Sequence, residues 1–127
     1  MAYLIYQKTL TDGQTEAINK DSTTPLAKAY FALLFPTQEA VTEALNRGIY
    51  ERTMVISHRD GLGVSLNEDV FHVGNGYAKD GIIVTSIKRH PSMSVGDLAV
   101  NLLDGDVYLC MPQGWKHLYL ELQLKEY

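Results

Sequence analysis

The 127-residue sequence has little of what disulfide scaffolds, metal centres and membrane proteins need. Cys110 is its single cysteine, which excludes an internal disulfide and a multi-cysteine zinc site and suits a reducing compartment. No apolar run approaches the roughly 20 residues that span a bilayer, and no apolar segment follows a basic start. We therefore expect a soluble, cytoplasmic protein that has no membrane segment and holds no metal or other cofactor.

Basic runs and catalytic motifs are also scarce. The formal net charge is −4, and no run of Lys or Arg is longer than Lys88-Arg89. A protein that neutralises many phosphates usually carries a basic stripe, so nucleic-acid binding is not favoured. The four histidines lack H-E-x-x-H spacing, and the sequence has no P-loop and no G-x-S-x-G motif. We expect a protein that is not an enzyme.

The composition that is present fits one globular domain over residues 1–127, with 46% hydrophobic and 20% charged residues. Residues 2–8 are typical of a strand that ends at Thr-Asp-Gly. Residues 10–18 are ambiguous between a polar connection and a second edge strand. Residues 20–24 indicate a loop.

Two helices are predicted in the first half. Thr24 is a good N-cap, Pro25 suits the first helical position, and residues 26–35 are apolar nearly all round. Such a helix is either buried on both sides or presents a binding surface. Pro36 ends it, Thr37 caps a second helix, and Gly48 suits its left-handed C-terminal cap.

The rest of the chain predicts mainly strands. Residues 50–57 alternate, so Tyr50, Arg52, Met54 and Ile56 are expected on one face. Ser65 and Glu68 match a capping box, which predicts a short helix over residues 66–73. Residues 82–87 are typical of a strand. The last third predicts a β-meander with a two-residue type I′ turn at Asp104-Gly105 and a final strand over residues 118–125.

The main candidates for binding or catalysis are the segment Ser92–Asp97 (SMSVGD) and the residue Trp115. Gly96 accepts a positive φ, and the Asp97 carboxylate can accept N–H bonds within the turn. These features favour a turn that begins a strand, although an anion site or a nucleophilic Ser94 is the functional alternative. Trp115 follows a Pro-Gly turn and is expected to cover the sheet as a core residue; an exposed interface position is the alternative.

These same residues carry a resemblance. The stretch from His90 to Asp97, followed by a hairpin and Gly114-Trp115, resembles the closing motif of YodL-like domains and related small proteins of phages, plasmids and other mobile elements. Residues 68–71 with Asn75 are similar to the acidic-aromatic helix of those proteins. The resemblance begins at Tyr50, and residues 77–87 are an insertion within it. It implies a phage or mobile-element accessory protein with no known catalytic residues.

We therefore expect an α+β fold: an antiparallel sheet of five or six strands, two N-terminal helices, a short third helix and a C-terminal meander that curls towards a half-barrel. The leading hypothesis is a non-enzymatic protein that binds a host or element-encoded protein, for host modulation or counter-defence. The candidate interface residues are Tyr30, Phe31 and Phe35. A homodimer through residues 26–35 or through a sheet edge would also bury apolar surface.

The second hypothesis is a small nucleic-acid- or nucleotide-binding module that uses the Ser92–Asp97 strand entry. The candidate binding residues are Ser94, Asp97, Trp115, Lys88, Arg89 and His90. In this hypothesis Lys88, Arg89 and His90 converge with the basic residues Lys116 and His117 beside the strand entry. A hydrolase that uses Ser94 or a histidine with Asp97 is a third and weaker hypothesis.

Overall fold

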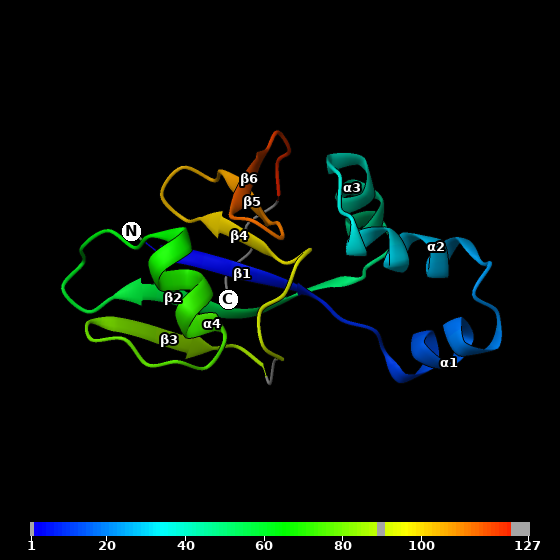
Figure 1. Ribbon diagram of the computed structural model, residues 1–127, viewed down its shortest axis with the longest axis horizontal. Coiled ribbons are helices and arrows are strands. Elements are labelled where there is room, and N and C mark those ends of the chain that lie inside the picture. The colour runs from blue at the N-terminus through cyan, green and yellow to red at the C-terminus, as the bar shows by residue number, and fades with distance from the viewer. Residues whose placement is uncertain (1, 89–90, 123–127) are drawn as a thin grey trace.

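The computed structural model describes residues 2–88 and 91–122 (Figure 1). Within these ranges the chain forms six strands and four helices, together with a 3-10 turn and a π turn. The elements are, in order, β1 (Ala2–Lys8), α1 (Asp12–Lys20), α2 (Pro25–Phe31), η1 (Ala32–Leu34), α3 (Gln38–Asn46), β2 (Tyr50–His58), η2 (Leu66–Val70), α4 (Phe71–Gly74), β3 (Ile82–Ser86), β4 (Leu98–Asn101), β5 (Val107–Cys110) and β6 (Trp115–Leu118).

The strands form one antiparallel sheet in the order β3-β2-β1-β4-β5-β6. This arrangement confirms the α+β class, the antiparallel pairing and the predicted number of strands. The sheet is open rather than closed into a barrel, so β3 and β6 are its two edge strands. Figure 1 shows α4 lying across the sheet, whereas α1, α2 and α3 extend beyond one end of β1 and β2.

Each face of the sheet buries its own apolar core. On one face, Leu33 of η1 and Val41 of α3 pack with strand residues such as Leu4, Val100 and Leu109. The opposite face is covered by the segment that contains η2 and α4, whose buried side chains Val64, Val70 and Val73 pack with Met54 of β2 and with Met93. Burying both faces gives a sheet of this size the apolar area that it needs without a disulfide.

Most of the predicted helix ends are confirmed. Thr24, Thr37 and Ser65 cap α2, α3 and η2, and each side chain accepts a backbone N–H from the first helical turn. Gly48 adopts φ +70°, and the N–H groups of Gly48 and Ile49 donate to Leu45 and Ala44, which completes the Schellman ending. Because the backbone tightens into η1 after Phe31, the first predicted helix is shorter than expected.

The prediction for residues 10–18 was wrong, because Asp12–Lys20 forms a third N-terminal helix, α1. Thr11 accepts the N–H of Gln14, and the Gln14 side chain accepts the N–H of Thr11 in return, which makes a complete capping box. Ile18 is the buried side chain of this helix. Because helix α1 buries so little apolar surface, its sequence shows almost no helical periodicity of hydrophobic residues.

The predicted facing of the second strand was also wrong in part. The β1–β2 register shifts between Ile5 and Tyr6, so Thr53 has no direct partner across the pair. Such a bulge reverses the alternation of side chains. Tyr50 therefore lies in the first core with Val55, whereas Met54 belongs to the second core.

Two predictions for the C-terminal meander need correction. The turn between β4 and β5 is not type I′, because that turn requires a positive φ at Asp104, and among the described residues only glycines have one. Instead, Gly105 donates to the Asn101 carbonyl across a longer loop, and the Asn101 side chain accepts the N–H of Leu103. The final strand ends at Leu118, so residues 119–122 are not strand, and residues 123–125 lie outside the described residues.

Candidate functional site

The turn that precedes β4 is built around a buried carboxylate rather than a reactive group. Asp97 is 1% exposed, and one carboxylate oxygen accepts the backbone N–H of Ser94 at 2.8 Å and the side-chain amide of Gln7 at 3.1 Å. The Gln7 carbonyl oxygen in turn accepts the Thr53 hydroxyl at 2.8 Å. Gln7 and Thr53 are each 1% exposed. This buried polar cluster joins β1, β2 and the entry to β4.

Two further contacts fix the same turn. The Tyr50 hydroxyl donates to the carbonyl of Gly96, and the Lys8 ammonium donates to the carbonyl of Val95. Burial raises the pKa of Tyr50, and the nearby Asp97 carboxylate raises it further. The phenol therefore stays protonated and acts as a hydrogen-bond donor at neutral pH.

Burial also raises the pKa of Asp97, although the Ser94 N–H and the Gln7 amide oppose the shift. Ser94 itself is exposed, and the four cavities described below are lined by residues other than Ser94 and Asp97. The geometry makes Asp97 an acceptor that orders its turn. Among the described residues, no group of three or more histidine, cysteine or acidic side chains could hold a metal ion.

Among the described residues, the basic side chains of the alternative binding hypothesis lie at opposite edges of the sheet. Lys88 follows β3 and lies 3.3 Å from the Glu51 carboxylate, in a 290 Å³ hollow that Glu51 and Tyr50 also line. Lys116 and His117 belong to β6, at the opposite edge of the sheet. Five strand spacings separate the two edges, or about 24 Å. Arg89 and His90 lie outside the described residues.

Trp115 opens β6 and is half-buried against the second core. It is cross-strand neighbour to Cys110 and lines a cavity of about 110 Å³ with Asn67, Phe71 and Met111. The indole therefore covers one end of the sheet beside η2, and one side of it faces this small cavity.

Three large exposed apolar side chains lie close together in sequence where α2 passes into η1. Phe31 is 43% exposed, Leu34 57% and Phe35 87%, while the half-buried Tyr30 ring contacts the Phe31 ring edge-on at 5.7 Å. We call Tyr30, Phe31, Leu34 and Phe35 the aromatic surface. Ala27, Ala29 and Leu33 supply the buried side of this segment, and Tyr30 packs partly against the first core, whereas Phe31, Leu34 and Phe35 are exposed.

A cavity of about 360 Å³ adjoins the aromatic surface. We call it the α1–α2 cavity; it is lined by Leu10, Thr15, Ile18, Asn19, Tyr30 and Phe31. Three residues after Phe35, the Gln38 side chain of α3 exchanges two hydrogen bonds with the backbone of Tyr119, at 2.9 and 3.2 Å. Tyr119 is itself highly exposed.

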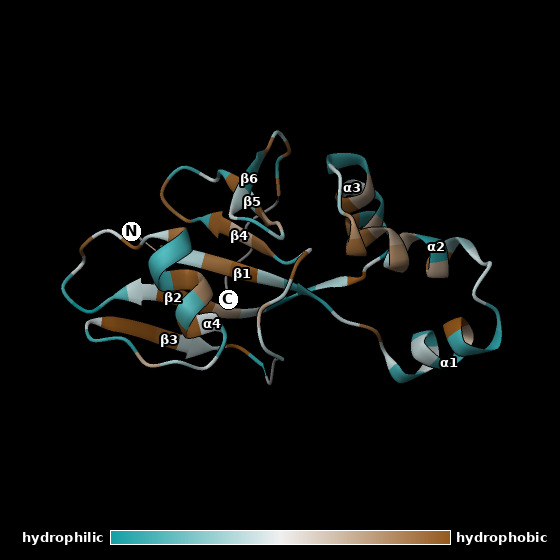
Figure 2. Cartoon of the chain, viewed as in Figure 1, coloured by the Kyte–Doolittle hydropathy of each residue, from teal (hydrophilic) through white to brown (hydrophobic). Residues whose placement is uncertain are grey.

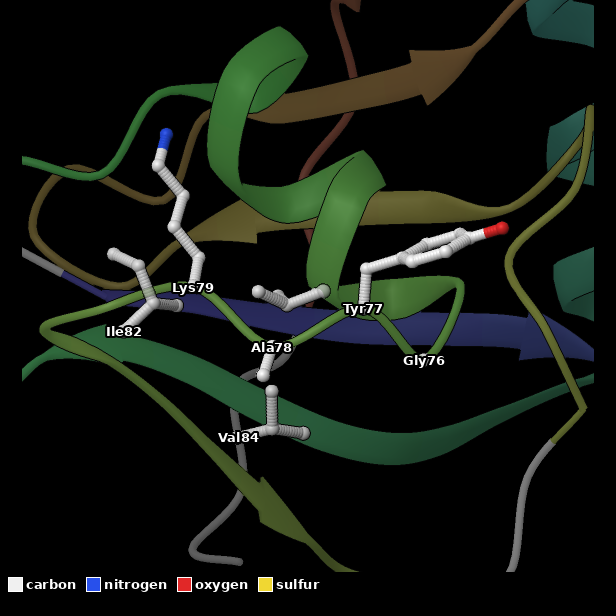
Figure 3. Close-up of a pocket in the computed structure, with 7 residues that line it drawn as sticks. Gly76, Tyr77, Ala78, Lys79, Ile82 and Val84 are labelled. Atoms are coloured by element: carbon white, nitrogen blue, oxygen red, sulfur yellow. The ribbon is translucent and has the colours of Figure 1, made fainter.

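A second apolar region lies at the edge strand β3. A cavity of about 360 Å³, here called the β3 cavity, opens between this strand and the loop that follows α4 (Figure 3). It is lined by Val73, Gly76, Tyr77, Ala78, Lys79, Ile82 and Val84. Lys79 binds the Asp69 carboxylate, so its ammonium is held at the rim by an ion pair.

Comparisons of this chain with family models, with curated proteins and with solved structures found no match. Among the described residues, no helix is long and apolar enough to cross a membrane.

Proposed function

We propose that this chain is a non-enzymatic accessory protein that binds another protein through its aromatic surface. The observation that carries the proposal is the run of exposed Phe31, Leu34 and Phe35 beside the α1–α2 cavity. Contiguous aromatic and aliphatic groups next to a hollow are typical of protein-binding surfaces, because a partner's side chain can enter the hollow while the rings lose water.

The buried polar cluster supports the non-enzymatic reading. Burial raises the pKa of Asp97, yet its carboxylate accepts hydrogen bonds from Gln7 and Ser94 within the fold. A functional carboxylate of raised pKa would need to face a cleft that admits substrate. On the basis of the resemblance to YodL-like proteins, we further propose that the chain is encoded by a phage or mobile element and acts in the bacterial cytoplasm. Its partner would be a host or element-encoded protein.

A crosslinking experiment tests the proposal. A photoreactive phenylalanine analogue placed at Phe35 would capture the partner from a bacterial host lysate, and the same analogue at Leu103, an exposed residue of the β4–β5 loop, is the matched control. The partner, once identified and purified, should bind the wild-type chain and lose at least about tenfold in affinity on Phe31→Ala or Phe35→Ala, but not on Leu103→Ala. Equal losses for all three variants would contradict the proposal.

The nucleic-acid alternative has a simpler test. A gel-shift assay with single- and double-stranded oligonucleotides at low salt should show no complex, because Lys88 and Lys116 lie at opposite edges of the sheet. A shift at low salt that weakens as salt rises would favour the alternative.

A further inference from the structure

Aromatic rings form a row on one face of the sheet at its β6 edge. His117 of β6 is the direct cross-strand partner of Tyr108 in β5, and their ring centroids lie 5.2 Å apart. The Tyr119 ring continues the row, 4.8 Å from His117, and the Tyr3 ring of β1 meets Tyr108 edge-on at 6.4 Å. Figure 2 shows pale and teal colours along much of β6, in contrast to the brown of β3 at the other edge. The β6 edge therefore presents polar aromatic side chains rather than aliphatic ones.

The outer end of this row is exposed and held in place. Tyr119 is 80% exposed, and the side chain of His117 is 37% exposed. The side chain of Gln38 in α3 accepts the N–H of Tyr119 and donates to its carbonyl, which fixes the backbone that carries the ring. Most of Tyr119 is thus open to solvent on a backbone that the fold holds in position.

Two carboxylates of the β4–β5 loop lie beside the row. The Asp106 carboxylate is 3.7 Å from the His117 imidazole, and the Asp104 carboxylate accepts the Asp106 N–H at 2.8 Å. Burial raises the pKa of Tyr108, and the charges of Asp106 and Asp104 raise it further, so both carboxylates lie close to this phenol. The loop therefore places negative charge next to the rings.

In the described part of the chain, no lysine or arginine forms an ion pair with Asp104 or Asp106. Lys116 precedes His117 in β6, but it pairs with Leu109 of the first core and so belongs to the opposite face of the sheet. The whole chain is also negative, with a formal net charge of −4. Because aromatic ring faces and carboxylates both attract cations, this surface is complementary to a positively charged group.

We call Tyr108, His117, Tyr119, Asp104 and Asp106 the β5–β6 face, and we propose that it binds an arginine-bearing segment of a partner protein. An arginine guanidinium is flat, so it can lie over the outer rings of the row while its N–H groups donate to a carboxylate in a forked pair. A lysine ammonium is a compact point charge without this shape. The β5–β6 face shares no residue with the aromatic surface, so this binding is additional to the proposed function.

Charge variants test the carboxylates. The probe is the peptide Gly-Arg-Gly-Arg-Gly with both ends blocked, titrated into the isotope-labelled full chain at about pH 8 and low ionic strength, and amide shifts in NMR spectra give the dissociation constant. The double variant Asp104→Asn with Asp106→Asn should raise this constant at least about fivefold, and its amide oxygen at position 104 can still accept the loop N–H.

A matched double variant controls for net charge. Asp12→Asn with Glu16→Gln removes the same two charges from the exposed surface of α1, and should change the dissociation constant by no more than about twofold. All variants should keep the wild-type circular dichroism spectrum. Equal losses for the two double variants would overturn the proposal, because binding would then follow net charge alone.

Ring variants and a lysine peptide test the stacking. Tyr119→Ala should raise the dissociation constant at least about threefold, whereas Tyr119→Phe, which keeps the ring, should not. Tyr77→Ala, which removes another exposed tyrosine, should also leave the constant unchanged. The blocked peptide Gly-Lys-Gly-Lys-Gly carries the same charge as the arginine peptide and should bind at least about threefold more weakly.

Three results of these titrations would overturn the proposal. They are no binding of the arginine peptide to the wild-type chain, equal losses for Tyr119→Ala and Tyr77→Ala, and equal affinities for the arginine and lysine peptides. None of the variants changes the aromatic surface, so failure here leaves the proposed function to its own test.

Discussion

The side-chain amide of Gln7 donates to the carboxylate of Asp97 across 3.1 Å, and this bond joins strand β1 to a turn that lies 90 residues later in the chain. Both side chains are buried, and Thr53 of β2 completes the cluster through the Gln7 carbonyl. No buried side-chain nitrogen or oxygen atom in the described part of the chain lacks a hydrogen-bond partner. Burying a polar group costs little free energy only while the group stays hydrogen-bonded. The cluster therefore specifies how these three segments meet.

Asp97→Ala should lower the free energy of unfolding by about 2 to 4 kcal/mol. The change leaves the Ser94 N–H without its acceptor and removes one acceptor of the Gln7 amide, which keeps the Pro91 carbonyl at 3.2 Å; it also opens a small void. Urea denaturation followed by circular dichroism measures the loss. The exposed Asp60 provides the control, because Asp60→Ala should change the unfolding free energy by no more than about 0.5 kcal/mol.

Two buried aspartates should give opposite dependences of stability on pH. The raised pKa of Asp97 means that the folded state holds this proton to a higher pH than the unfolded state does, so its contribution to stability falls as the pH rises through the folded pKa. For Asp69 burial alone would raise the pKa, but bonds from Lys79 and the Ser65 N–H outweigh it and lower the pKa. Its contribution is present above the unfolded pKa and is lost as the pH falls through the folded pKa.

The matched variants Asp97→Asn and Asp69→Asn separate these effects. From about pH 3.5 to 7, the unfolding free energy of Asp97→Asn should rise relative to wild type, and that of Asp69→Asn should fall relative to wild type. Urea titrations at several pH values measure both slopes. Slopes of the same sign would contradict the roles assigned to the two carboxylates.

Local patterns were enough to predict the elements that begin or end at a specific residue type. The caps at Thr24, Thr37 and Ser65 and the ending at Gly48 depend on neighbouring backbone groups, so the sequence around each was sufficient. Helix α1 was missed because only Ile18 is buried, and the usable signal was the capping box formed by Thr11 with Gln14.

The site was harder to predict because it depends on long-range pairing. Asp97 was singled out from its turn, but its partners Gln7 and Thr53 are polar residues that alternation alone would place in water. The bulge beside Tyr6 turns Thr53 inward, and no local pattern signals it. The exposure of Phe31 and Phe35 likewise depends on where the α-helix tightens into η1, which periodicity does not determine.

Gly96→Ala should destabilise the fold by about 2 to 4 kcal/mol, more than a left-handed backbone alone would cost. Gly96 has φ +96°, and an added Cβ would lie 2.9 Å from the Leu33 carbonyl oxygen, which is backbone and cannot easily move. Gly105 is the matched control, since it has φ +81° with nothing within 4 Å of an added Cβ. Gly105→Ala should cost only about 1 kcal/mol in the same denaturation experiment, and equal losses would contradict a steric role for Gly96.

Cys110 should be nearly inert to thiol reagents in the folded protein. Its side chain is 1% exposed, and burial, followed by the nearby Asp97 charge, raises the pKa of the thiol to about 11. The thiolate is the reactive form, so at pH 8 only about one molecule in a thousand carries it, against roughly one in four for an unperturbed cysteine. Reaction with an aromatic disulfide reagent should therefore be at least about 100-fold slower in buffer than in denaturant.

Gly96→Ala should speed the reaction in buffer, because Gly96 donates to the Cys110 carbonyl at 2.9 Å and helps to hold that strand end closed. A native rate close to the denatured one would show that β5 is open at Cys110.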